Sequence, residues 1–317
     1  MKIKNYLSII GLIFFFYILY DVGIIKILSA IKNSNPYYLA AAALLTPLFI
    51  LPLAFKWHLI LKRQGFNLKF LYVLRLYYIG AFYGFITPAH IGSLIRAHYL
   101  KKKTKKDLIE CASSIVIERI LDLFVIFIFA FVGALIFIKS SLGIVSPLII
   151  SFIIFLLVIL VFMRKKRGMF FLSIFYNLLL PKNIKEKADS SLDRFYNSLP
   201  RLRKLIIVFI ITILTWIFFY SQTYIFAKAF YINIPFYIFV SFVSIGTVIA
   251  TIPISISGLG TREFTLITLF SLFNIPPEAT VSMSLVSFFM TGLIEGSLGL
   301  YFAFKEDEIL DYNTISS

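Results

Sequence analysis

Seven ionisable side chains stand within or beside stretches of this sequence that are otherwise apolar. They are Arg96, Glu118, Arg119, Asp122, Arg262, Glu263 and Glu295. A charge at membrane depth costs at least about 2.5–3.5 kcal/mol, so such groups usually face a cavity and pair with one another. Arginine suits phosphate because its planar donors bind two oxygens at once. The pattern therefore predicts a polar cavity in which Arg96, Arg119 and Arg262 hold an anionic group such as a lipid phosphate.

The same charges could instead form ion pairs that hold helices together. Arg96 could pair with Glu118 or Asp122. Arg262 could pair with Glu295. Glu118 and Asp122 are four residues apart, so on a helix they share one face. We expect these two acids to be structural and the arginines to be partly functional.

Two breaks that contain proline and glycine precede arginines in corresponding parts of the sequence. The break residues are Pro88, Gly92 and Pro253, and Ser255, Gly258 and Gly260 are added to the predicted substrate site. The half-helices that begin after such breaks have N-termini that attract anions. Interrupted apolar segments in matching positions of two halves point to a transporter-type site near the midplane of a membrane.

The composition indicates an environment of lipid around these residues. Of 317 residues, 60% are hydrophobic, 18% aromatic and 15% charged. A soluble domain has about 45–50% apolar and about 25% charged residues. A soluble protein this apolar could not cover its surface with polar groups, so the chain is predicted to be a polytopic, all-α membrane protein.

A bilayer-spanning helix needs about 20 mostly apolar residues. Stretches of about that length are Tyr6–Asp21, Tyr37–Leu61, Leu121–Ile138 (in a helix from about Leu108), Ile144–Met163, Leu205–Ala227 and Val281–Phe304. Shorter ones are Phe70–Phe85, Tyr237–Thr251 and Glu263–Phe273. The first stretch is not expected to be a cleaved signal peptide, because no small-residue cleavage site follows it.

The net charge of +16 comes from Lys and Arg gathered between the apolar stretches. Short basic loops stay in the cytoplasm, which places Lys62–Lys69, Lys101–Lys106 and the basic loop 164–204 inside, with both termini cytoplasmic in the cell membrane. Residues 169–180 of that loop are predicted to form an interfacial amphipathic helix. No nucleic-acid-binding module accompanies the basic residues, so nucleic acid is not expected as a partner.

This orientation predicts a single membrane domain, 1–317, built of two inverted-topology halves at about 1–138 and 144–304. Each half reads as helix, helix, broken re-entrant hairpin, helix, and a short polar tail, 305–317, follows. One cysteine, Cys111, excludes an internal disulfide. The histidines His58, His90 and His98 lack neighbouring ligands at metal-binding spacing, so no metal and no cofactor is expected.

Three motifs in order resemble the lysylphosphatidylglycerol synthase transmembrane-region family, flippase-like integral membrane proteins of the UPF0104 type. They are Thr87-Pro88-x-x-x-Gly92-x-x-x-Arg96-Ala97, Glu118-Arg119-x-x-Asp122-Leu123 and Pro253-x-Ser255-x-x-Gly258-Leu259-Gly260-x-Arg262-Glu263. The resemblance implies handling or translocation of a lipid, in bacteria aminoacylated phosphatidylglycerol. Ser93 and His90 depart from the family's pattern, which weakens transfer of the substrate. Only a polar tail follows the last apolar stretch, so we expect the membrane region without a soluble aminoacyl-transferase domain.

Three functions remain open from the sequence. The favoured one is a translocase for an anionic or polyprenyl-linked lipid, without direct use of ATP because no G-x-x-x-x-G-K-[ST] loop is present. The second is a membrane enzyme that acts on a lipid-linked phosphate or sugar, with Glu118, Asp122, Glu263 or Glu295 as general base. The third is a non-catalytic partner that anchors a soluble enzyme through its basic cytoplasmic loops.

Overall fold

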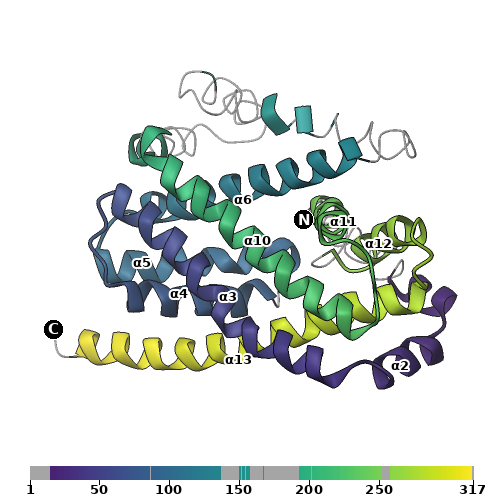
Figure 1. The fold of residues 1–317 in the computed structure, drawn as a ribbon. Coiled ribbons are helices and arrows are strands. Elements are labelled where there is room, and N and C mark those ends of the chain that lie inside the picture. Colours follow the sequence, from purple (N-terminus) through teal and green to yellow (C-terminus); the bar gives the residue numbers. More distant parts are fainter. Residues whose placement is uncertain are drawn as a thin grey trace, which may run out of the picture.

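The computed structural model describes residues 15–85, 87–136, 150, 152–153, 155–157, 167, 193–200, 202–251 and 258–315. Within these ranges the secondary structure is helical and no strand occurs, and the helices form one bundle (Figure 1). The prediction of an all-α fold is confirmed. The described residues do not include 1–14 or the predicted interfacial helix 169–180. Of the predicted span Ile144–Met163 they include only 150, 152–153 and 155–157.

The described helices differ widely in length, from nine residues in α2 to 39 in α13 among the labelled α-helices. In chain order they are residues 15–22, α2 (Ile24–Lys32), α3 (Pro36–Arg63), α4 (Phe70–Phe85), the 3-10 helix η1 (Pro88–Leu94), α5 (Ile95–Thr104), α6 (Leu108–Ile136), residues 193–198, the 3-10 helix η2 (Leu202–Leu205), α10 (Ile206–Ala229), α11 (Phe236–Thr251), α12 (Thr261–Ser271) and α13 (Pro277–Ile315).

Among the described helices, three are long and apolar enough to cross a bilayer. They are Pro36–Arg63, Arg203–Ala229 and Pro277–Glu306. Their outward faces carry large apolar side chains, such as Leu44 on α3, which is 75% exposed, and Leu293 on α13, which is 65% exposed. Side chains of this kind on the outside of a bundle are solvated by lipid rather than water, as a membrane protein requires.

The predicted spans match the observed helices closely, with two corrections. The last helix does not end at Phe304 before a polar tail but continues as α13 to Ile315. A hydropathy window detects the edge of an apolar segment rather than the end of a helix. The short helix α2 was not predicted, because nine residues are too few for a spanning segment.

The two halves repeat the same elements at a constant spacing. α4 and α11 are each 16 residues long. They begin at Phe70 and Phe236, α5 and α12 begin at Ile95 and Thr261, and in both cases the separation is 166 positions. α3 and α10 end at Arg63 and Ala229, again 166 apart. The second half is therefore a structural repeat of the first.

Equivalent helices of the two halves run in opposite directions. At one end of α3 the Asn35 backbone N–H donates to the Ala229 carbonyl (2.9 Å). About two and four turns further along α3, the Gln222 side chain donates to the Ala42 carbonyl (3.1 Å) and the ring of Phe49 lies 5.4 Å from that of Phe219. Residue numbers rise along α3 while they fall along α10. This antiparallel relation is that of inverted-topology repeats.

Each half contains a broken hairpin whose ends meet. In the first, Lys103 Nζ at the end of α5 lies 5.7 Å above the ring of Tyr72 at the start of α4. In the second, the ring of Phe242 in α11 lies 5.8 Å from those of Phe270 and Phe273 at the end of α12. Each hairpin thus enters and leaves the bundle on one side.

The hairpins interlock with the other half. α4 packs along α13, and α11 packs along α6. Glycines permit both contacts, because a Cβ on Gly299 of α13 would collide with the Tyr78 carbonyl of α4, and one on Gly133 of α6 with Ser241 of α11. Gly133 and Gly299 are themselves 166 positions apart. The two halves therefore form one body.

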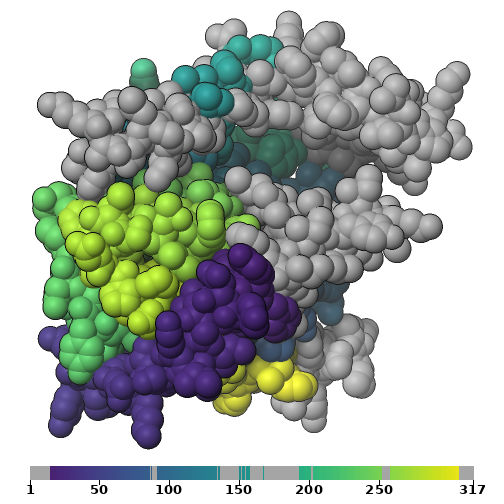
Figure 2. Space-filling model, turned by 90° about the vertical axis from the view of Figure 1, so that its right-hand side faces the viewer, coloured from purple at the N-terminus to yellow at the C-terminus, as the bar shows by residue number. Residues whose placement is uncertain are grey.

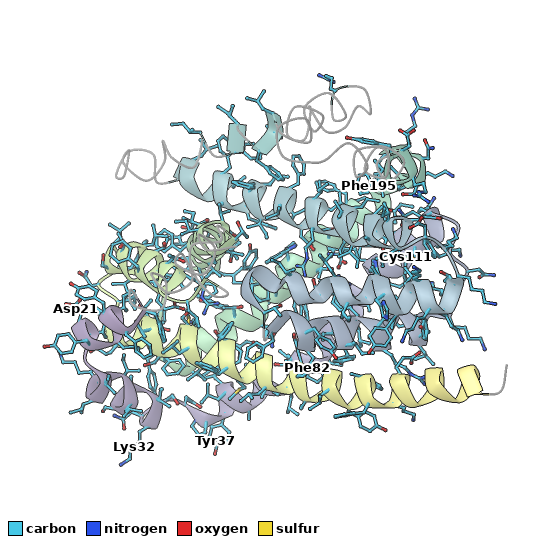
Figure 3. All side chains as sticks on the ribbon, turned by 180° about the vertical axis from the view of Figure 1, so that it is seen from behind. Asp21, Lys32, Tyr37, Phe82, Cys111 and Phe195 are labelled. Carbon is cyan, nitrogen blue, oxygen red and sulfur yellow. The ribbon has the colours of Figure 1, made fainter. Side chains whose placement is uncertain are left out.

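The described residues at positions 64, 107, 194 and 198, in or beside the loops predicted to be cytoplasmic, meet at one end of the bundle. Gln64 Nε2 donates to the Ser198 carbonyl (3.1 Å), and Arg194 pairs with Asp107 (2.7 Å). Figure 3 shows Cys111 and Phe195 at this end and Asp21, Lys32 and Tyr37 at the opposite end. At that opposite end α2 lies against α12 and α13 (Figure 2). Which end faces the cytoplasm stays a prediction.

Candidate functional site

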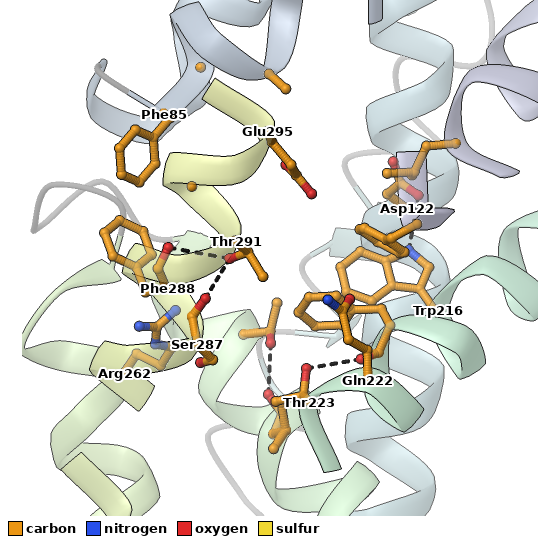
Figure 4. Close-up of a pocket in the computed structure, with 18 of the residues that line it drawn as sticks. Phe85, Asp122, Trp216, Gln222, Thr223, Arg262, Ser287, Phe288, Thr291 and Glu295 are labelled. Carbon is orange, nitrogen blue, oxygen red and sulfur yellow. Dashed lines mark hydrogen bonds between the residues drawn. The ribbon is translucent and has the colours of Figure 1, made fainter. Parts of the chain in front are cut away.

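A cavity of about 310 Å³ lies between the two halves. Its lining residues come from α3, α4, η1, α5 and α6 of the first half and from α10, α11, α12 and α13 of the second (Figure 4). The volume is at the lower end of the range of about 300–1,000 Å³ found for ligand pockets. The cavity thus has the size and the position, at the repeat interface, of a binding site in a transporter.

The structure brings five of the seven predicted ionisable residues to this cavity. The five lining residues are Arg96, Arg119, Asp122, Arg262 and Glu295. The other two, Glu118 and Glu263, are buried behind the arginines with which they pair. Residues that are more than 150 positions apart in the sequence therefore surround one space.

Lys56 neutralises the acids of α6 and was missed in the sequence. Its fully buried Nζ donates to Asp122 Oδ1 (2.6 Å) and lies 3.7 Å from Glu118 Oε1. Trp216 Nε1 donates to the same Asp122 oxygen (2.9 Å). A lysine inside the apolar stretch 37–61 was a signal for this role. That Glu118 and Asp122 have a structural role stays a prediction.

Arg96 is held from several sides. Its Nη2 donates to Glu118 Oε2 (2.9 Å), which realises one of the pairings predicted for it. The guanidinium lies 4.5 Å from the centroids of both Trp57 and Tyr77, a geometry that stabilises a cation on two aromatic faces. Its stem occupies the space that a Cβ on Gly80 would need. Arg96 Nη1 is buried and has no hydrogen-bond partner among the described residues.

Arg119 differs from Arg96 in exposure and pairing. It is exposed, and it lines the cavity. Its Nη2 donates to Ser93 Oγ (3.1 Å), a neutral acceptor. Within the part of the chain that the structure describes, no carboxylate lies within ion-pair distance of Arg119. Arg119 therefore faces the cavity without an ion-pair partner among the described residues, and Glu118 and Asp122 act on it from beyond ion-pair distance.

Arg262 pairs with its sequence neighbour. Its Nη2 and Nε donate to Glu263 Oε1 (2.9 and 3.1 Å), and the guanidinium lies 5.3 Å from the centroid of Phe288. Glu263 also accepts from Ser284 Oγ (2.7 Å). The predicted pairing of Arg262 with Glu295 is wrong, because the fully buried carboxylate of Glu263 needs the counter-charge and lies closer.

Glu295 points into the cavity from α13 (Figure 4). It is partly buried, and no hydrogen bond or ion pair joins it to a described residue. Each of Glu118, Asp122 and Glu263 has a cation within 4 Å. Glu295 is thus the acid of the predicted site whose charge is uncompensated by its surroundings.

The break residues shape the turns rather than the cavity wall. Pro88 begins η1, and the Gly92 N–H donates to Thr87 Oγ1 (2.8 Å) where a Cβ would collide with the Tyr83 carbonyl. Gly258 and Gly260 have φ angles of 78° and 87°, which favour glycine. Pro253 and Ser255 lie outside the described residues.

At the N-terminus of α12, which was expected to attract an anion, a backbone N–H group already has a partner within the protein. The Gly260 N–H donates to Glu263 Oε2 (2.6 Å), so the carboxylate already occupies this N-terminus. At α5, the Ile95 N–H bonds to carbonyls of η1, which continues directly into the helix. The N–H groups of Gly260 and Ile95 therefore already have partners within the protein.

Two comparisons with known proteins bear on this cavity. The family model for the lysylphosphatidylglycerol synthase transmembrane region matches residues 6–298. A UPF0104 membrane protein of Methanocaldococcus jannaschii is 27% identical to this chain, in an alignment that covers 94% of this chain and 95% of that protein. The range that the family model matches contains the ionisable residues that line the cavity.

Proposed function

The chain belongs to the lysylphosphatidylglycerol synthase transmembrane-region family, and on that premise we propose that it binds a lipid with an anionic, phosphate-bearing headgroup in the cavity between its two halves and moves it across the bilayer. The observation that carries the proposal is Arg119, an exposed cavity cation with no carboxylate partner among the described residues.

A cation without a counter-charge in a membrane protein is costly unless a ligand supplies the missing charge. Arg96 and Arg262 are already neutralised by Glu118 and Glu263. They add donors at the wall of the cavity, and Arg96 Nη1 is a buried donor that still lacks an acceptor. A phosphate that accepts from Arg119 would place its remaining oxygens among these donors.

The rest of the wall suits the part of a lipid next to its phosphate. Hydroxyl groups of Ser287 and Thr291 and rings such as Phe85 and Phe288 line the cavity side by side (Figure 4). Hydroxyl groups bind glycerol or sugar oxygens, and the rings accommodate the start of an alkyl chain. A phospholipid and a polyprenyl phosphate share this chemistry, so the test compares both.

Headgroup translocation in proteoliposomes tests the proposal. Fluorescent phosphatidylglycerol, polyprenyl phosphate and phosphatidylcholine are each followed in vesicles that contain the wild type, Arg119→Gln or Arg203→Gln. Charge-assisted hydrogen bonds contribute about 1.5–3 kcal/mol, so Arg119→Gln is expected to slow transfer of anionic lipids roughly tenfold to hundredfold.

Arg203→Gln removes the same charge from an exposed position at the end of the bundle and is expected to behave as the wild type. Transfer of one anionic lipid but not the other would identify the headgroup. Equal rates in Arg119→Gln and the wild type, or no transfer of either anionic lipid by a folded wild type, would overturn the proposal.

A further inference from the structure

The charges around the cavity divide into paired and unpaired groups. In the described part of the chain, the cations that line it or pair with its lining are Lys56, Arg96, Arg119 and Arg262, and the carboxylates are Glu118, Asp122, Glu263 and Glu295. Lys56 and Arg96 neutralise Glu118 and Asp122, and Arg262 neutralises Glu263. One cation, Arg119, and one acid, Glu295, remain, and both face the cavity.

In the empty cavity the formal charges of Arg119 and Glu295 compensate each other without direct contact. An anion bound to Arg119 removes that compensation. An ionised Glu295 would then be a surplus negative charge beside a bound anion, in surroundings of low dielectric where repulsion is strong. Neutralising Glu295 with a proton relieves both the repulsion and the cost of the buried charge.

We propose that Glu295 is a proton-binding site linked to the headgroup site, so that the anion binds with Glu295 neutral. This inference rests on the proposed anion binding at Arg119. Wherever the empty cavity holds Glu295 as a carboxylate, binding of one anion is accompanied by transfer of one proton from hydronium in solution to a Glu295 oxygen. The O–H bond of the carboxyl group forms as an O–H bond of hydronium breaks and leaves water. A headgroup that enters together with a proton couples lipid movement to the proton gradient.

Other ionisable groups around Glu295 leave it as the proton acceptor. Several elements pack against α13 or face it across the cavity. The ionisable side chains that they contribute to the lining are Tyr77 of α4, Arg96 of α5, Arg119 and Asp122 of α6 and Arg262 of α12. Tyr78 of α4 also interacts electrostatically with Glu295. Asp122 is held by Lys56 and Trp216. The described residues of α2, α3 and α10 contribute no ionisable group to the lining.

The pH dependence of binding tests this linkage. Short-chain phosphatidylglycerol is titrated into the detergent-purified protein from about pH 5 to about pH 9, a range in which its phosphodiester keeps one charge. Wild-type affinity is expected to fall with rising pH, approaching about tenfold per pH unit where Glu295 ionises. Glu295→Gln, which is neutral throughout, should lose this dependence and bind at high pH as the wild type does at low pH.

Glu110→Gln is the matched control, because Glu110 pairs with Lys106 near the end of the bundle and should keep the wild-type profile. A second measurement needs no variant. Calorimetry of wild-type binding in two buffers with different ionisation enthalpies reports proton uptake directly, and uptake approaching one proton per lipid is expected.

The outcomes separate the two proposals. Absence of wild-type binding at every pH would overturn the anion site itself. Binding that is independent of pH, or a wild-type profile retained in Glu295→Gln, would overturn the proton linkage while the anion site stands. Tighter binding at high pH, lost in Glu295→Gln, would also overturn it, since the lipid would then bind with Glu295 ionised rather than neutral.

Discussion

At the scale of single residues, arginines of similar sequence context have different roles. Arg96 is buried between two rings and paired with Glu118, whereas Arg119 faces the cavity with a serine as its neighbour. Substitution of Arg96 would therefore leave Glu118 with less compensation and disturb folding, while Arg119 can be changed with less risk. Arg119 is the better residue with which to test ligand binding.

Lys56 permits a stability prediction. Removing one partner of a buried ion pair costs about 3–5 kcal/mol because the other charge stays buried. Lys56→Met is expected to lower the thermal unfolding midpoint in detergent markedly, since Asp122 loses its cation. Adding Asp122→Asn, which removes that charge but keeps an acceptor for Trp216, should recover part of the loss. The exposed Lys101→Met serves as control, and an unchanged midpoint in Lys56→Met would contradict the prediction.

At the scale of helices, glycines set how closely the halves approach. Gly299 and Gly296 lie one turn apart on α13, yet only a Cβ on Gly299 would meet backbone, at the Tyr78 carbonyl. The nearest atom to a Cβ on Gly296 is Phe82 Cδ2 at 3.8 Å, an ordinary contact. The spacing of these glycines in the sequence gives no reason to distinguish them. The packing of α4 against α13 determines which of the two positions lacks room for a Cβ atom.

The two glycines form a matched pair for mutagenesis. Gly299→Ala is expected to lower thermal stability because α4 must move away from α13. Gly296→Ala should be neutral or slightly stabilising, since alanine is favoured over glycine in a helix by up to about 1 kcal/mol. The test compares the thermal unfolding midpoints of the two variants in one detergent. Equal midpoints would show that the close approach at Gly299 does not contribute to stability.

At the scale of the whole molecule, the repeat places two hairpins around one cavity from opposite ends. The first hairpin ends at residues 101–106, at the end of the bundle where Arg194 pairs with Asp107. The second hairpin closes at the other end, close to α2 (Figure 2). The proposed translocation requires that this site be reached from either side of the membrane in turn, by movement of one half against the other.

Cysteine accessibility tests this arrangement in a membrane. Cys111 is buried, so Lys102→Cys and Lys32→Cys, both at exposed positions, can be labelled singly in oriented vesicles. An impermeant reagent is expected to reach Lys102→Cys from the cytoplasmic side and Lys32→Cys from the outside. Gln64→Cys, in the loop before α4, should share the sidedness of Lys102→Cys, because both ends of the first hairpin meet there. Labelling from opposite sides would contradict the hairpin.

Composition and the spacing of apolar stretches were sufficient to predict the membrane helices that the structure describes, the interruptions after α4 and α11 and most of the charged residues at the cavity. They suffice because burial of a helix in lipid depends on local hydropathy, and because a charge inside such a helix is costly wherever it lies. The partners of those charges depend on packing between segments that are distant in sequence. Lys56 reaches Asp122 because α3 lies against α6, and Arg262 is neutralised by Glu263 rather than by Glu295. Tertiary structure alone therefore decided which arginine and which acid face the cavity unpaired.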